Sequence, residues 1–362
     1  MASKMNLKLV SLDDGGIRGF SQLEIMSNIM HRLNWEHQSD ESEECRLPYE
    51  HFDLIGGSGT GGLIAILLGK LRMSVEEASD TFFSIVEHAY TPSNLSASER
   101  SGALRKCMED AMRSKGLPID LQLVGKQQAG CPCFVVASPR TNASSTLCFR
   151  SYPIRSQPSS KITVIDAVLA TCATQPDFAS VHSGSGLKRR EYISSSGAAY
   201  PTHEAISEAH LLFGGDATVA SILSMGTGHP GIISFPQEGG EAALLKTMRE
   251  MMHDCEQRAQ QMEQQIGRDG IYSRLSVEQG LQNHHSEQTS KPEWIVAQTE
   301  DYLNLRDTRN KLDLFVKNIT DQTATITLDH LRHVSDSRAP ERMAVSVEKS
   351  LGILSEQASL KF

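Results

Sequence analysis

Two glycine-rich segments constrain the fold more than any other feature of this sequence. The first, DDGGIRG at residues 13–19, follows the alternating apolar run at 7–12. The second, GGSGTGG at residues 56–62, follows FDLI and precedes the apolar stretch 63–71. Strands that turn sharply through glycines into helices are typical of α/β proteins. The sequence therefore predicts an α/β fold with a mainly parallel central sheet.

The other predicted elements continue this alternation to about residue 240. We expect further strands at 52–55, 134–137, 146–151 and 219–225, and further helices at 21–34, 164–171 and 203–212. A capping box of Ser74 and Glu77 predicts another helix start.

From residue 241 the pattern becomes helical. Residues 241–268 predict one long helix, 292–319 a second helical stretch, and the alternating 323–328 an edge strand. We expect one domain over 6–320, with its helical part from about 241, and a partly ordered tail over 321–362.

Charge and composition exclude several function classes. The net charge of −9 argues against nucleic acid as a partner, because phosphate binding needs a basic face. It also disfavours docking on an anionic membrane surface, although a local patch could still do so. The first residues lack the apolar region of a secretory signal, and the seven cysteines have no disulfide-framework spacing. We therefore expect a cytoplasmic protein without stable membrane insertion.

The glycine turns themselves have a chemical use. Backbone amides at the start of a helix stabilise a negative charge, such as a phosphate or the oxyanion of an acyl-transfer reaction. The second turn also has the shape of a nucleophile elbow, in which a strand–turn–helix exposes one side chain. Neither nucleotide-binding motif, G-x-G-x-x-G at the first turn or G-x-x-x-x-G-K-[ST] elsewhere, is present. We expect no cofactor and no metal.

Several ordered segments resemble the patatin-like phospholipase family, in particular its fungal type. SLDDGGIRGF resembles the family's SLDGGGIRG, and FDLIGGSGTGGLIAI resembles FDLIGGTSTGGLIAI. VIDAVLATCATQPDF, EYISSSGAAYPTHEAISEA and SILSMGTG follow in the family's order, and the likeness runs from about Lys8 to Asn318. The resemblance implies a three-layer sandwich and a pocket beneath the two turns, suited to an apolar ligand with one polar end.

The family's hydrolytic residues do not carry over. Members of the family use a Ser–Asp dyad, with the Ser in G-x-S-x-G and the Asp in a D-G-G/A turn. Here Gly59 stands at the nucleophile position, and Ser58 falls one residue early. The dyad Asp aligns with Ser194, and no carboxylate lies within 193–197. Asp14 replaces the first of three glycines in the oxyanion turn. We therefore expect no efficient dyad-type hydrolysis.

Three departures from the family pattern supply new groups. Asp14, Asp177 and Tyr200 are the candidate acid–base residues, because a carboxylate in a partly apolar pocket can titrate near neutral pH. Each has an ordinary alternative: a cap on the following amides for Asp14, a solvated loop for Asp177, and packing beside Pro201 for Tyr200.

The candidate substrate-binding residues lie on the two turns and near the lost dyad Asp. Arg18 could hold a carboxylate or enolate, with structural clamping of the turn as its alternative. The full set is Gly15, Gly16, Arg18, Ser58, Gly59, Thr60 and Ser194.

Three functions remain open at this point. The first is non-hydrolytic chemistry (cyclisation, isomerisation or elimination) on an acyl or polyketide-like molecule, as in secondary metabolism. The second is a silent binding or scaffold protein, and the third a lipid acyl hydrolase that uses Ser58. The retained glycines favour a working pocket and hence the first. The expected partner is an apolar or acyl small molecule, and a homodimer is left open.

Overall fold

The protein is described by a computed structural model. It covers residues 6–37, 45–125, 130–158, 160–184, 186–236, 239–267, 270–282, 291–321 and 326–336. Its strands are β1 (Leu7–Leu12), β2 (Leu54–Ser58), β3 (Cys133–Pro139), β4 (Leu147–Arg150), β5 (Val181–Ser183), β6 (Arg190–Ile193), β7 (Thr218–Met225), β8 (Tyr272–Leu275) and β9 (Ile326–Thr327).

The strands form one mixed sheet with a parallel centre. Their order is β5-β6-β3-β2-β1-β7-β8, with β4 on β3 and β9 on β7. The five central strands β3, β2, β1, β7 and β8 are parallel neighbours, whereas β4, β5, β6 and β9 pair antiparallel. The predicted mainly parallel sheet is therefore confirmed.

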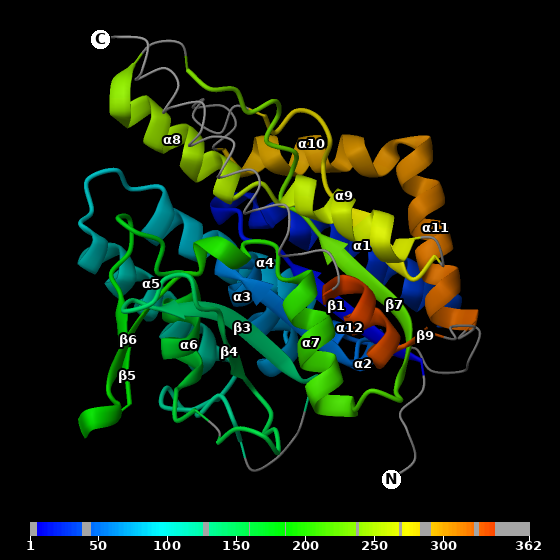
Figure 1. Ribbon diagram of the computed structural model, residues 1–362, viewed down its shortest axis with the longest axis horizontal. Coiled ribbons are helices and arrows are strands. Elements are labelled where there is room, and N and C mark those ends of the chain that lie inside the picture. Colours follow the sequence, from blue (N-terminus) through cyan, green and yellow to red (C-terminus); the bar gives the residue numbers. More distant parts are fainter. Residues whose placement is uncertain are drawn as a thin grey trace, which may run out of the picture.

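Helices cover both faces of this sheet (Figure 1). They are α1 (Gly19–His37), α2 (Pro48–His51), α3 (Gly59–Ala65), α4 (Val75–Ile85), α5 (Ala97–Ser114), α6 (Val164–Thr171), α7 (Thr202–Phe213), α8 (Gly240–Met252), α9 (Cys255–Ile266), α10 (Pro292–Asn304), α11 (Arg306–Asp321) and α12 (Leu328–Asp336).

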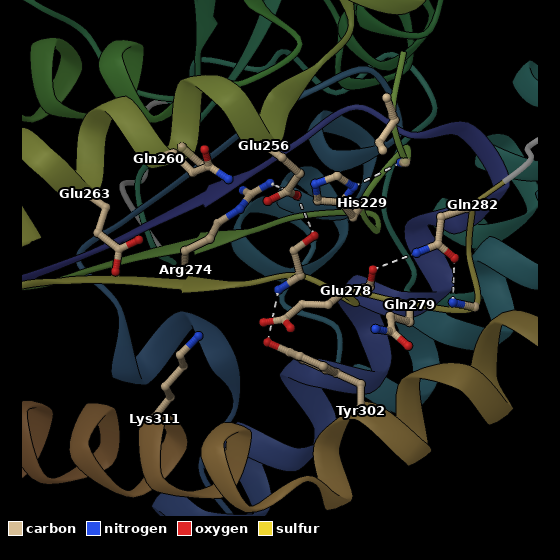
Figure 2. Close-up of a pocket in the computed structure, with 15 residues that line it drawn as sticks. His229, Glu256, Gln260, Glu263, Arg274, Glu278, Gln279, Gln282, Tyr302 and Lys311 are labelled. Atoms are coloured by element: carbon tan, nitrogen blue, oxygen red, sulfur yellow. Dashed lines mark hydrogen bonds and ion pairs between the residues drawn. The ribbon is translucent and has the colours of Figure 1, made fainter. Parts of the chain in front are cut away.

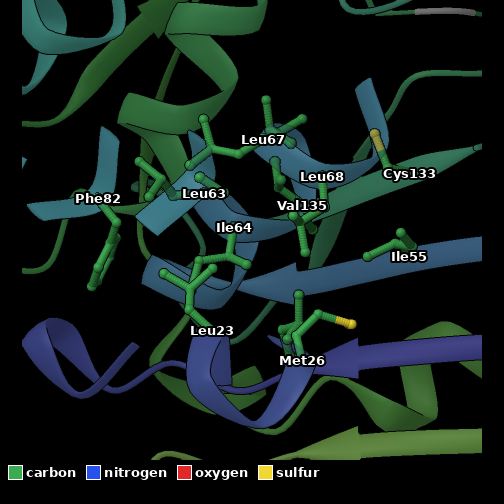
Figure 3. Close-up of a cluster of buried hydrophobic side chains, with 14 of the residues drawn as sticks. Leu23, Met26, Ile55, Leu63, Ile64, Leu67, Leu68, Phe82, Cys133 and Val135 are labelled. Atoms are coloured by element: carbon green, nitrogen blue, oxygen red, sulfur yellow. The ribbon is translucent and has the colours of Figure 1, made fainter. Parts of the chain in front are cut away.

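The alternation of β1 divides the core into two clusters. Val10 and Leu12 join the larger cluster, which takes apolar side chains from α1, α3, α4, α5, α6, α10 and α11. Leu7 and Leu9 join the smaller one, with α7, α9 and α12. Successive side chains of a strand point to opposite faces, so a strand between two helical layers is apolar on both sides. Figure 3 shows part of the larger cluster, where Leu23 of α1 lies near Ile64 of α3.

The C-terminal helical region differs from the sequence prediction. In place of the one predicted helix, the structure has two, α8 and α9, because Asp254 accepts hydrogen bonds from the amides of Glu256 and Gln257 and caps a new helix. The stretch 292–319 is likewise divided into α10 and α11.

Part of the predicted tail belongs to the core. β9 pairs with β7, and Leu328 and Leu331 of α12 are buried in the smaller cluster. Of the predicted strand 323–328, only Ile326–Thr327 is described as a strand, and Leu328 begins a helix. Residues 322–325 and 337–362 lie outside the described part of the chain.

Candidate functional site

The two glycine turns lie beside each other because their parent strands are parallel neighbours. β1 leads into the first turn and pairs with β2, which leads into the second. A Cβ on Gly61 would lie 2.4 Å from the carbonyl oxygens of both Leu12 and Asp13. A Cβ on Gly57 would lie 2.3 Å from the carbonyl carbon of Gly61. Backbone therefore packs on backbone here, and the glycines are required by close approach.

The second turn keeps the geometry of an elbow while its apex has no side chain. β2 ends at Ser58, α3 begins at Gly59, and Gly59 has a φ of +52°. Its amide donates to Thr171 Oγ1 at 2.9 Å. This left-handed conformation suits glycine and would strain most other residues.

Asp14 fills the space that a side chain at Gly59 would need. A Cβ built on Gly59 would lie 2.0 Å from Asp14 Cγ and Oδ1. Asp14 Oδ1 also accepts a hydrogen bond from the Thr60 amide at 3.3 Å. The carboxyl group of the first turn thus stands over the apex of the second, at the amino end of α3. Asp14 and Gly59, which were both selected from the sequence, are therefore neighbours in space.

A large cavity opens over these turns, with a volume of about 1040 Å³. It is lined by seven of the ten predicted site residues: Asp14, Gly15, Gly16, Arg18, Gly59, Thr60 and Asp177. Apolar and aromatic side chains also line it: Leu245, Met248 and Met252 of α8, with Tyr90 and Phe178. A concave site with apolar walls and a few polar groups is the usual form of a small-molecule pocket.

Arg18 brings a positive charge to this cavity. Its Nη1 atom is buried and has no hydrogen-bond partner among the residues that the structure describes. Burial lowers the pKa of Arg18, against the raising effect of nearby negative groups that include Asp14. Arginine nonetheless stays protonated at neutral pH. A buried cationic donor without a partner is costly, and an anionic ligand group would satisfy it.

Asp177 reaches the cavity from a more open position. It is exposed and lies in the loop that follows the cis peptide bond between Gln175 and Pro176. The Gln175 side chain donates to the Phe178 carbonyl oxygen at 2.7 Å and closes this loop. The solvated-loop alternative therefore describes its surroundings, although the residue does border the cavity.

Cys172 is a cavity residue that sequence reasoning did not select. Burial and then the negative charge of Asp14 raise the pKa of its thiol. The thiol donates to the Gly59 carbonyl oxygen at 3.4 Å. A protonated buried thiol is a poor nucleophile, so Cys172 is not a candidate nucleophile.

Three predicted site residues do not line the cavity. Tyr200 is buried, and its hydroxyl group lies 2.9 Å from that of Tyr272, as the packing alternative describes. Ser58 is fully buried, and its Oγ has no partner within the described residues. Ser194 is also buried and donates its amide to Ala173.

A buried ion network that sequence reasoning missed lies directly behind Asp14. Asp13 is fully buried, and Arg274 Nη2 lies 2.7 Å from Asp13 Oδ2 and 2.6 Å from Glu256 Oε1. Burial raises the pKa of Asp13 to about 6, although Arg274 opposes the shift. For Glu256, burial acts to raise the pKa, but Arg274 and Ser276 lower it on balance. Arg274 thus lies between two carboxyl groups whose pKa values shift in opposite directions.

Glu256 lines both the main cavity and a second cavity of about 630 Å³. Figure 2 shows this second cavity, with Arg274 and Glu256 together on one side and Tyr302 and Lys311 on the opposite side. Its walls are mostly polar, with Glu263 and Gln260 from α9. From Glu256, the ion network extends through Arg274 to Asp13, which lines neither cavity.

The described residues hold no group of three or more His, Cys, Asp or Glu side chains arranged to bind a metal ion. Within the same ranges, no helix combines the length and the apolar character needed to cross a membrane.

Comparisons with known proteins assign the family. A family model described as patatin-like phospholipase matches residues 10–206, more than half of the 362-residue chain. Phospholipase A I of Arabidopsis thaliana is 30% identical over 79 residues, which are 22% of this chain and 5% of that protein. The crystal structure of VipD from Legionella pneumophila matches with a TM-score of 0.41 and 10% identity, over 86% of this chain and 68% of that one. With its matched segment spanning both glycine turns, the chain belongs to the patatin-like phospholipase family.

Proposed function

We propose that the protein binds an acyl or polyketide-like small molecule in the main cavity and transforms it without hydrolysis. One observation carries this proposal: the Asp14 carboxyl group occupies the space above Gly59 where a nucleophile side chain would begin. Glycine cannot act as a nucleophile, and a carboxylate in that place opposes an oxyanion. The same carboxylate is suited to moving a proton.

Asp14 and Arg18 together support proton abstraction next to a carbonyl group. The Asp14 carboxylate takes the proton from the carbon beside the carbonyl. The C–H electron pair forms the C=C bond of an enolate, and the carbonyl π pair moves onto the oxygen. Arg18 neutralises that enolate with its unpaired Nη1. Returning the proton to another carbon gives isomerisation, loss of a β-leaving group gives elimination, and attack of the enolate carbon gives cyclisation. Asp177 and Tyr200 are candidate proton donors, although only Asp177 borders the cavity.

Hydrolysis through Ser58 receives less support from the geometry. Its Oγ is fully buried, and no base lies within hydrogen-bond distance of it among the described residues. A serine without an adjacent base is a weak nucleophile. The retained cavity and the unpaired Arg18 favour a ligand-binding protein over a silent scaffold.

Hydrogen exchange tests the proposal without knowledge of the natural substrate. The protein is incubated in D₂O with a long-chain acyl thioester, and mass spectrometry measures deuterium at the carbon beside the carbonyl. Wild type should accelerate exchange, and Asp14→Asn should lower the rate at least ~100-fold, as general-base removal does. Asp120→Asn, at an exposed position outside the cavity, is the matched control.

Two results would overturn the proposal. One is equal exchange by wild type and Asp14→Asn. The other is covalent labelling of wild-type Ser58 by a fluorophosphonate probe, read by intact mass, together with ester turnover. That second result would restore a serine hydrolase.

A further inference from the structure

Helix α8 is weakly held and carries a wide exposed apolar stripe. Of its thirteen residues only Thr247 is buried. Leu244, Met248, Met251 and Met252 follow one another at helical spacing, and each is at least 37% exposed. Figure 1 shows α8 along the outer side of the molecule, and within the described ranges it makes no extensive contact with another helix or strand.

The segment before α8 also exposes large apolar side chains. Ile232 is 97% exposed and Phe235 is 59% exposed. Together with the apolar residues of α8, they form what we call the α8 surface: Ile232, Phe235, Leu244, Leu245, Met248, Met251 and Met252. Exposed apolar surfaces of this kind mark interaction sites in proteins.

The α8 surface is continuous with the main cavity. Leu245, Met248 and Met252 are half-exposed and also line that cavity. The apolar stripe of α8 therefore reaches from the outside of the helix to the wall of the cavity. A second copy of the chain packed on this face would instead cover the cavity mouth.

The charges on α8 indicate which kind of surface it meets. Its two acidic residues, Glu241 and Glu250, are balanced by Lys246 and Arg249. With a net charge of −9, the whole chain is repelled by anionic lipid. A neutral, amphipathic helix suits a surface without net charge.

We propose that the α8 surface docks reversibly on a zwitterionic lipid bilayer and receives an apolar ligand from it for the main cavity. Ligand transfer rests on the proposed function, whereas docking can be measured without it. Insertion of Met, Leu and Phe side chains into the interface supplies the binding energy.

Vesicle co-sedimentation of the full chain tests the docking. Phosphatidylcholine vesicles should bind the wild type, and the double variant Phe235→Glu/Met251→Glu should reduce the partition coefficient at least tenfold. Neither residue lines the main cavity, so fluorescence of a dansyl-labelled fatty acid should report unchanged ligand binding. The control is Leu314→Glu, because Leu314 on α11 is 55% exposed, close to the 59% of Phe235 and 48% of Met251.

The outcomes separate docking from the proposed function. Equal vesicle binding by wild type and the double variant would overturn the docking, as would no binding by wild type. A dimer in light scattering that the double variant dissociates, with no vesicle binding, would assign the α8 surface to a second copy and also overturn it. Vesicle binding by a wild type that fails to bind the fatty acid would support docking and contradict the proposed function alone.

Discussion

The glycine turns and helix α8 border the same cavity, yet they are held in opposite ways. At the turns, backbone lies against backbone, and an added Cβ at Gly57 or Gly61 would come within 2.4 Å of main-chain atoms. Along α8, apolar side chains are half-exposed and only Thr247 is buried. One wall of the cavity is therefore fixed by packing, and the other is free to meet a partner.

This difference predicts that substitutions at the two turns will depend on each other. At the turns, the carboxyl group of residue 14 and a side chain at residue 59 would claim the same space, so one of them must shift. A loose wall such as α8 imposes no such coupling. Substitutions should therefore have large, interdependent effects at the turns and small, independent effects on α8.

The largest effect is expected for Gly57→Ala. Its Cβ would lie 2.3 Å from the carbonyl carbon and oxygen of Gly61, and backbone atoms cannot move aside as side chains do. We expect a loss of more than about 3 kcal/mol in unfolding free energy, measured by urea denaturation. Gly102→Ala in α5 is the control, because nothing lies within 4 Å of the added Cβ, and alanine should stabilise that helix by up to about 1 kcal/mol. A small loss of unfolding free energy in Gly57→Ala would show that the backbone at the turns can shift to make room for the added Cβ.

The next effect concerns the buried carboxyl group behind the turns. The folded pKa of Asp13 is raised from 3.8 to about 6, so the folded state binds more protons than the unfolded state between these pH values. Stability from this group is therefore present below about pH 4 and lost as pH rises through 6, by about 3 kcal/mol in total. In Asp13→Asn this pH-dependent loss disappears, so its stability relative to wild type should increase from pH 4 to pH 7. If urea titrations give the same difference in unfolding free energy between wild type and Asp13→Asn at every pH, the raised pKa is contradicted.

A double-mutant cycle measures the coupling between the two turns. Gly59→Ser alone places a Cβ 2.0 Å from Asp14 Cγ and adds strain at a φ of +52°, so we expect a loss of about 2 kcal/mol. Adding Asp14→Gly removes the clash. The double variant should then be more stable than the sum of the single losses by at least about 1 kcal/mol. Additive losses would mean that positions 14 and 59 do not interact.

Local signals explain which parts of the fold could be predicted from the sequence. The bounds of β1 and α6 agree with the predicted ranges, because a buried strand and a buried helix leave continuous apolar patterns. The Ser74–Glu77 capping box is also confirmed. The break between α8 and α9 was missed because Asp254 lies inside a long polar helical pattern, where its capping role has no distinct signal.

Local sequence signals likewise explain which residues of the candidate site could be predicted. Asp14 and Gly59 could be selected because they depart from a family motif at known positions. The ion network of Asp13, Glu256 and Arg274 could not be predicted. These residues meet only through the pairing of β1, β7 and β8 and the position of α9. An Asp at the end of an apolar strand was the one available signal. Tyr200 was selected beside the motif, but its side chain packs against Tyr272 in the smaller core cluster.

The smallest effect is expected on α8, where the loose wall should tolerate substitution. Met251 is 48% exposed, so truncation to Ala removes little buried surface and should change the unfolding free energy by less than about 0.5 kcal/mol. The matched change Met26→Ala removes a fully buried side chain of α1 and should cost about 2–5 kcal/mol. Both can be measured by urea denaturation of the lipid-free protein. A comparable loss at Met251 would mean that α8 is held by contacts as firm as those of the core, and a face held in that way could not be free to dock on a bilayer.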